Sequence, residues 1–154
     1  LISMLYSMLE IRIAKEQEIE EIARLEQEIF PDPWSLTALR DTWNQKQAQI
    51  LGAWLDGQMA GYVIVYFAAD ESEIARIAVD EKFRRQGVAG ALLDEMERVL
   101  AGKGIARLML DVRKSNAAAL RFYLSRGFKE DGVRKNFYTN PIEDAILMSR
   151  RLGR

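Results

Sequence analysis

The sequence predicts one domain of the α/β (α+β) class, in which helices cover both faces of a mixed β-sheet. Three observations support this prediction. Several segments alternate apolar and polar residues as half-buried strands do, and others repeat apolar residues at helical spacing. A strand, a helix and a strand follow one another within residues 73–112, which predicts a crossover between parallel strands. Two apolar segments are joined by Asp56-Gly57, a dipeptide typical of antiparallel hairpins.

The boundaries of the predicted elements follow from these periodicities and from residues that cap or end helices. Pro31 and Pro33 end the first helix, because proline disfavours the helical conformation in the residue before it. Ser35 suits the N-cap of the second helix and Ser115 or Asn116 that of the last one, and Gly127 follows the end of the last helix. The elements are, in order, strand 9–13, helix 16–29, a short helix from Ser35 to Trp43, strands 49–55, 59–67 and 73–79, helix 87–100, strand 105–112, helix 116–126, and strands 128–138 and 145–151.

The length and composition suit a single domain with its own core. The chain has 154 residues, of which 49% are hydrophobic, enough to form a core without disulfides or a structural metal. We expect this domain to occupy residues 9–154 and residues 1–8 to be an N-terminal extension, because the patterned sequence begins at Leu9. The formal net charge is −1, which gives no reason to expect nucleic acid or an anionic membrane as a partner.

The absence of cysteine and histidine from the sequence excludes several kinds of chemistry. The chain has no thiol nucleophile, no Ser-His dyad, no disulfide and none of the common zinc sites. We therefore expect no metal, and we expect carboxylates, Tyr, Lys or water to transfer protons. No apolar segment approaches the ~20 residues that span a bilayer, so we expect a cytoplasmic protein that does not enter the membrane.

The segment Arg84–Gly90, between a predicted strand and a predicted helix, is a candidate anion site. A helix N-terminus presents N–H groups and partial positive charge that suit a phosphate. Gly87 and Ala89 allow an anion to approach the backbone, and Arg84 and Arg85 add positive charge. In the alternative interpretation, the arginines are solvated loop charges and Gly87 only shapes a turn. The segment contains neither G-x-x-x-x-G-K-[ST] nor G-x-G-x-x-G.

Two motifs in this order resemble those of the GNAT family of N-acetyltransferases. The segment Ile77–Ala89 resembles the family's acetyl-coenzyme A motif, Gln/Arg-x-x-Gly-x-Gly/Ala, and Leu110–Phe128 looks like its second motif. The outer segments Phe30–Ser35 and Asn136–Ala145 are similar to the RimI-type branch, which acetylates the N-terminal amine of a small-subunit ribosomal protein. The resemblance extends from about Leu9 to the end and implies a mostly antiparallel sheet with a central, splayed parallel pair.

The resemblance also implies acetyl-coenzyme A as the cosubstrate and assigns residues to it. Backbone groups of Ile77, Ala78 and Val79 would pair with the pantetheine arm, which requires the two parallel strands to splay. In the alternative interpretation, these three residues form an ordinary core strand. Asn116 would also contact the cofactor. Backbone N–H groups of six consecutive residues would hold the pyrophosphate, namely those of Arg85, Gln86, Gly87, Val88, Ala89 and Gly90.

Attack of an amine on a thioester needs a proton acceptor, a donor to the oxyanion and a proton donor for the thiolate. In the family pattern, the residue at the Tyr123 position protonates the thiolate and a carboxylate at the Asp111 position takes a proton from the amine. The RimI-type pattern has Glu there, so the shorter Asp111 is withdrawn by roughly 1.5 Å and we expect it to act through a water. Alternatively, Asp111 is a polar strand end and Tyr123 a core aromatic. Glu143 and Asp144 could attract a cationic peptide terminus or simply face solvent.

The leading hypothesis is an acetyl-coenzyme A-dependent N-acetyltransferase for a protein N-terminus, by resemblance that of a ribosomal protein beginning with alanine. A second hypothesis is an acetyltransferase for a lysine or a small-molecule amine. A third, from a different class, is a non-catalytic acyl-coenzyme A-binding module; the departure at Asp111 keeps it open, whereas Tyr123 argues against it. The sequence gives neither the identity of the acceptor nor the oligomeric state.

Overall fold

The computed structural model describes residues 8–153, whose seven strands form one sheet in the order β1-β2-β3-β4-β5-β7-β6. Most of the expected N-terminal extension, residues 1–7, lies outside the described residues. The sheet is mostly antiparallel, and β4 and β5 form the predicted parallel pair. The strands are β1 (Leu9–Ile13), β2 (Ala48–Leu55), β3 (Gln58–Ala68), β4 (Glu71–Val79), β5 (Arg107–Arg113), β6 (Lys129–Tyr138) and β7 (Glu143–Arg151). The helices are α1 (Ile19–Ile29), α2 (Leu36–Trp43), α3 (Val88–Gly102) and α4 (Ala117–Ser125), with 3-10 turns η2 (Glu16–Glu18) and η3 (Glu81–Phe83).

The chain forms two compact units. The first contains the residues up to Tyr66 together with Ala75–Val99, and the second contains Phe67–Ile74 together with Leu100–Arg154. Strands β3 and β4 therefore contribute residues to both units.

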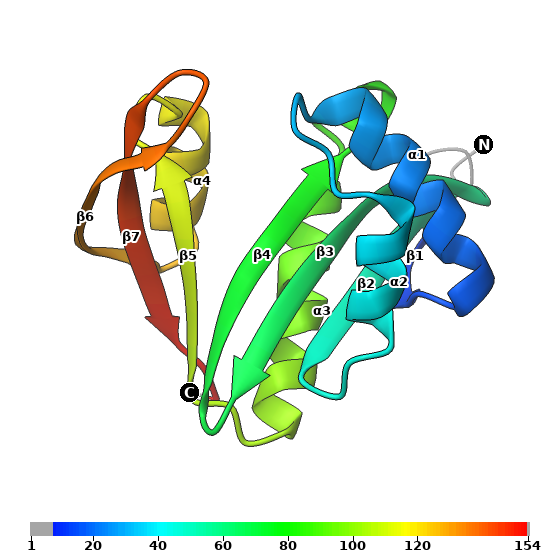
Figure 1. The fold of residues 1–154 in the computed structure, drawn as a ribbon. Coiled ribbons are helices and arrows are strands. Elements are labelled where there is room, and N and C mark those ends of the chain that lie inside the picture. The colour runs from blue at the N-terminus through cyan, green and yellow to red at the C-terminus, as the bar shows by residue number, and fades with distance from the viewer. Residues whose placement is uncertain (1–7, 154) are drawn as a thin grey trace, which may run out of the picture. The chain divides into compact units, whose positions relative to one another are not determined.

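In the first unit, helices lie on both faces of the strands, with α1 and α2 on one face and α3 on the other (Figure 1). The apolar residues of α1 recur at three- and four-residue intervals, which places them on one side of the helix. On the opposite face, Leu92, Leu93 and Met96 of α3 are fully buried. The core between α1, α2 and the strands includes Ile19, Ile22, Leu25, Leu39, Ile50, Tyr62 and Ile64.

The hairpin between β2 and β3 forms at the predicted dipeptide. Asp56 and Gly57 have φ angles of 51° and 84°, the left-handed values that a tight hairpin turn requires. Farther along β3, a Cβ at Gly61 would lie 2.5 Å from the carbonyl oxygen of Ala78. Glycine at this position is therefore what allows β3 to approach the β4 segment that we predicted to bind the cofactor.

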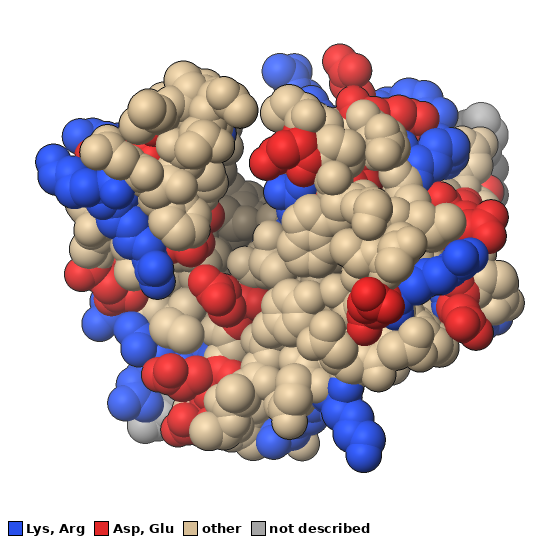
Figure 2. Space-filling view, viewed as in Figure 1, with Lys and Arg blue, Asp and Glu red and all other residues tan. Residues whose placement is uncertain are grey.

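In the second unit, β5, β7 and β6 form an antiparallel ribbon. Alternate residues of β5 are buried (Leu108, Leu110 and Val112), so Asp111 lies on the opposite, less buried face. Strand β6 is exposed along almost its whole length, and Figure 2 shows both basic and acidic side chains over it. The predicted cap of α4 is confirmed, because the Asn116 Oδ1 accepts a hydrogen bond from the Ala119 N–H at 3.1 Å.

Four predicted elements begin two or three residues from the expected position. Strands β4 and β7 begin two residues earlier, at Glu71 and Glu143, and two other elements begin later. The helix expected from Glu16 starts as a 3-10 turn and becomes α-helical at Ile19, because the Glu18 carboxylate accepts the Lys15 N–H at 2.7 Å and fixes the turn. The strand expected from Ile105 begins at Arg107, because the Ile105 N–H still donates to the last turn of α3, at the Leu100 oxygen. The two later starts arise from local hydrogen bonds that the apolar pattern does not encode.

Candidate functional site

The loop before α3 contains two residues in the left-handed conformation directly ahead of the helix N-terminus. Arg85 and Gly87 have φ angles of 66° and 78°, and α3 begins at Val88. A Cβ at Gly87 would meet no atom within 4 Å, so this position requires glycine for its φ angle and not for lack of space. The Arg84 Nε donates to the Val79 oxygen at 3.3 Å and ties the loop to the end of β4. The loop therefore holds the left-handed residues and the helix N-terminus that suit a phosphate.

The predicted pantetheine-binding residues Ile77–Val79 form the last three positions of β4. The parallel ladder pairs Glu71 with Arg107, Ser72 with Leu108 and Glu73 with Met109. As far as the structure describes this ladder, Ile77–Val79 lie beyond its last pair. The first unit thus contains Ile77–Val79 and residues 85–90, whereas Asp111, Asn116 and Tyr123 belong to the second.

Asp111 has an acidic neighbour as well as a basic one. Its side chain is 15% exposed, and the Arg134 Nε lies 3.5 Å from its Oδ1. The pKa of Glu73 of β4 is raised, first by partial loss of solvent around its carboxyl and then by the negative charge of Asp111. Glu73 was not among the predicted site residues, because the apolar pattern of β4 does not distinguish it from the other charged residues of the strand, Glu71 and Arg76.

Tyr123 of α4 is 6% exposed and packs edge-on against Phe122 and Phe128, with ring centroids 5.1 and 5.4 Å away. The pKa of Tyr123 is raised to about 12, mainly by burial and secondly by the nearby Tyr138. Its hydroxyl therefore stays protonated at neutral pH. Burial and then the charge of Asp111 raise the pKa of Tyr138 as well. Tyr138 is therefore electrostatically coupled to both predicted catalytic residues, a role that we did not predict for it.

The two carboxylates at the start of β7 stabilise the local backbone. Glu143 accepts hydrogen bonds from the Ser115 N–H and from Arg113, and these bonds lower the pKa of its carboxyl. The Asp144 Oδ1 accepts the Asn136 N–H at 2.9 Å. These contacts explain why both residues are acidic without requiring a peptide terminus nearby.

In the first unit, Glu26 is a fully buried carboxylate surrounded by donors. It accepts the Trp34 N–H at 2.9 Å, the Arg76 Nε at 2.8 Å and the Tyr62 hydroxyl. The Arg76 guanidinium also stacks on Phe30, 3.8 Å from the ring centroid. This cluster fixes the segment between α1 and α2 against β3 and β4, and its long-range partners were not apparent from the sequence.

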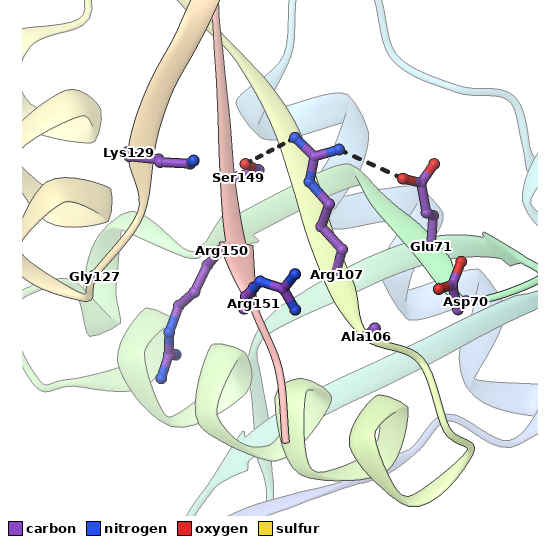
Figure 3. Close-up of a pocket in the computed structure, with 9 residues that line it drawn as sticks. All are labelled: Asp70, Glu71, Ala106, Arg107, Gly127, Lys129, Ser149, Arg150 and Arg151. Carbon is purple, nitrogen blue, oxygen red and sulfur yellow. Dashed lines mark hydrogen bonds and ion pairs between the residues drawn. The ribbon is translucent and has the colours of Figure 1, made fainter. Parts of the chain in front are cut away.

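The second unit also has a pocket of about 630 Å³ beside the N-terminal end of β5 (Figure 3). Arg107 lies in it and bonds to Ser149 at 3.2 Å and to Glu71 at 3.4 Å, so acidic and basic side chains of the wall pair with each other. Asp111 is not part of its wall. The lining residues are Asp70, Glu71, Ala106, Arg107, Gly127, Lys129, Ser149, Arg150 and Arg151.

Among residues 8–153, none of the helices is both long and apolar enough to cross a membrane. The same part of the chain contains no group of three or more Asp, Glu, His or Cys side chains placed to hold a metal ion.

Sequence comparison relates the chain to known acetyltransferases. The model of the family described as "Acetyltransferase (GNAT) family" matches residues 19–128. The chain is 37% identical over 127 residues to the [ribosomal protein bS18]-alanine N-acetyltransferase of Escherichia coli K12, covering 81% of this chain and 85% of the relative. It is 33% identical over 141 residues to the enzyme of the same name from Salmonella typhimurium, covering 90% and 95%.

Solved structures agree with this relationship. The crystal structure of the ribosomal-protein-S18-alanine N-acetyltransferase from Escherichia coli superposes with a TM-score of 0.88 at 33% identity, covering 96% of each chain. Ard1 from Thermoplasma volcanium superposes with a TM-score of 0.84 at 26% identity, covering 95% of this chain and 99% of Ard1.

Proposed function

The chain belongs to the acetyltransferase (GNAT) family, and from this membership we propose that it transfers an acetyl group from acetyl-coenzyme A to the N-terminal α-amine of a ribosomal protein that begins with alanine. The choice of acceptor rests on sequence and structural similarity. Over most of both chains, this protein is similar to enzymes named for alanine acetylation of protein bS18. Such an acceptor is made in the cytoplasm, and we propose that the reaction takes place there.

The geometry of the first unit fits the cosubstrate. Backbone groups of Ile77, Ala78 and Val79 would hold the pantetheine arm, and the N–H groups of Arg85, Gln86, Gly87, Val88, Ala89 and Gly90 would hold the pyrophosphate. The left-handed φ angles of Arg85 and Gly87 support this assignment, because they turn successive N–H groups toward one side of a loop. Asn116 caps α4 with its oxygen, so a contact with the cofactor would use its amide NH2 group. When bound, the thioester supplies the acetyl group.

The chemistry requires one group that removes a proton and one that supplies a proton. Asp111 is the candidate acceptor, because its carboxylate remains partly exposed beside a cation. Tyr123 is the candidate donor to the departing thiolate, because its raised pKa keeps the hydroxyl protonated. An N–H group of Ile77–Val79 would stabilise the oxyanion.

Mass spectrometry of the products tests the proposal. The chain is incubated with acetyl-coenzyme A and, separately, with an N-terminal-Ala peptide, the same peptide blocked at its terminus but carrying Lys, and a polyamine. We expect acetylation of the free N-terminus, because an α-amine has a pKa of ~7.7–8.0 against ~10.4 for lysine and so loses its proton far more easily. Equal or faster acetylation of the blocked Lys peptide would contradict the proposed acceptor, and coenzyme A binding without any product would indicate a binding module.

A further inference from the structure

Glu73 and Asp111 are acidic residues on neighbouring parallel strands and on the same face of the sheet. Glu73 is in register with Met109, and residues two apart along a strand point to the same side, so Asp111 is the diagonal neighbour of Glu73. The negative charge of Asp111 acts on Glu73 and raises the pKa of its carboxyl. Two adjacent carboxylates repel each other, so this geometry favours uptake of a proton by one of them, which the other can then share.

The charges around the pair leave it acidic overall. Arg134 of β6 is a cation beside it; its Nε lies 3.5 Å from the Asp111 Oδ1, its guanidinium lies over the Phe137 ring at 5.5 Å, and its side chain is 52% exposed. Arg134 lowers the pKa of Glu73, but burial and Asp111 outweigh it. Tyr138 also interacts with Asp111 and is flanked by Arg113. Two carboxylates and one solvated guanidinium make a place that attracts a cationic amine.

The pair also compensates for the short side chain of Asp111. Aspartate is one methylene shorter than glutamate, so Asp111 alone is a retracted base. Glu73 has the longer side chain and lies on the adjacent strand. We propose that Glu73 and Asp111 act as one carboxylate pair in which Glu73 takes the proton from the acceptor amine and Asp111 shares it, an inference that rests on the proposed acetyl transfer.

The step balances with groups that the chain and the substrates supply. The amine nitrogen forms the new C–N bond to the thioester carbonyl carbon, and its proton passes to the Glu73 carboxylate. The C–S bond breaks, and the thiolate takes a proton from the Tyr123 hydroxyl. Solvent then removes the proton from the pair and restores the one on Tyr123, so the amide, the free thiol and both side chains end in their starting protonation states.

Three single substitutions and one double substitution test the pair, with kcat/KM for the N-terminal-Ala peptide measured across pH. Glu73→Gln should lower kcat/KM by about 10²-fold, the lower end of the range for a positioned base. Glu71→Gln is the matched control, because Glu71 is on the same strand and face but pairs with Arg107 at 3.4 Å; its kcat/KM should stay within about twofold. Glu73→Gln with Asp111→Asn should lose little more than the worse single variant, because two residues that act as one unit are not additive.

The outcomes separate the proposal from its rivals. Near wild-type activity of Glu73→Gln would overturn it and leave Asp111 as a lone base, and multiplicative losses in the double variant would overturn the sharing. Coenzyme A affinity, measured by calorimetry, should be equal in all variants, which distinguishes lost chemistry from a damaged cofactor site. A folded but slow Glu73→Asp variant that is faster than Glu73→Gln would support a carboxylate role over mere packing.

Titration of the Glu73 carboxyl tests the pair without any acceptor substrate. Carbon-detected NMR of the wild-type chain should show Glu73 titrating above the ordinary carboxyl range, and in Asp111→Asn its midpoint should fall. An unchanged Glu73 midpoint in that variant would overturn the pair. If the wild-type chain does not acetylate the N-terminal-Ala peptide, the proposed function fails, while this titration still decides whether the two carboxyls are coupled.

Discussion

Glu26 in the first unit and Asp111 in the second are both largely buried carboxylates, yet their partners differ in kind. Glu26 has no exposed surface and is surrounded by donors from Trp34, Tyr62 and Arg76. Asp111 is 15% exposed and shares its surroundings with one loosely held arginine and a second carboxylate. A carboxylate that has a full set of donors stabilises the structure, whereas one that is left beside a like charge can exchange protons.

The largest effect that we expect comes from breaking the Glu26 cluster. Glu26→Ala leaves the mostly buried Arg76 without its carboxylate partner and should lower the free energy of unfolding by about 3–5 kcal/mol. Urea denaturation followed by circular dichroism measures this loss. Glu28→Ala, on the same helix, removes only a surface pair with Arg24 and should cost less than about 0.5 kcal/mol. Equal losses in the two variants would contradict the structural role of Glu26.

Two buried tyrosines allow the same chemical change to be made in each region. Tyr123→Phe should lower kcat by about 10²-fold, equivalent to about 2.7 kcal/mol in activation free energy, with little loss of stability. Tyr62→Phe removes a donor from Glu26 and should cost about 1–3 kcal/mol of stability while the folded enzyme keeps its kcat. Steady-state kinetics and urea melts on both variants are the measurements. A Tyr123→Phe variant with wild-type kcat would show that solvent protonates the thiolate.

Two glycines sharpen the contrast between a structural turn and a functional loop. Gly57 and Gly87 have φ angles of 84° and 78°, and a Cβ at either would meet no atom within 4 Å. Alanine at each should therefore cost a similar ~1–2 kcal/mol of backbone strain. Only Gly87→Ala should also weaken coenzyme A binding, measured by calorimetry. If the affinity fell equally in Gly57→Ala, the loop before α3 would have no special role.

The smallest effect concerns Arg134, the cation beside the acidic pair. This arginine lowers the pKa of Glu73, so Arg134→Gln should raise that pKa further. A base must be deprotonated to accept a proton, so the acid limb of kcat/KM should move to higher pH and activity at neutral pH should fall by a few-fold at most. The raised pKa also affects stability. An acid whose pKa is higher in the folded state than in the unfolded state destabilises the fold as the pH rises from the unfolded pKa toward the folded pKa. A shift of the acid limb to lower pH would contradict this arrangement.

The sequence was sufficient for features that depend on neighbouring residues. The Asp56-Gly57 hairpin, the Ser35 cap of α2 and the Asn116 cap of α4 each follow from a few adjacent positions, and the structure confirms all three. The parallel pair was also correct, because a strand, a helix and a strand in succession leave little alternative.

Features that depend on register or on distant contacts were not predictable. Whether Glu73 is near Asp111 depends on which residue of β5 faces it, and a one-residue slip would put the two on opposite faces. Two of the donors to Glu26 come from positions 36 and 50 residues away. The roles assigned to Asp111, Tyr123 and the cofactor-binding residues remain predictions that the variants above can test.

The exposed strand β6 forms one edge of the sheet and has a bearing on how the protein behaves at high concentration. An edge strand can pair with the edge of another molecule and so begin aggregation. Here Lys129, Glu130, Asp131, Arg134 and Lys135 occupy the strand, and its pairing with β7 is interrupted by shifts in register. Charges and irregular register both oppose the addition of a further strand. Variants that neutralise β6 should therefore be the first to precipitate during concentration, whatever their activity.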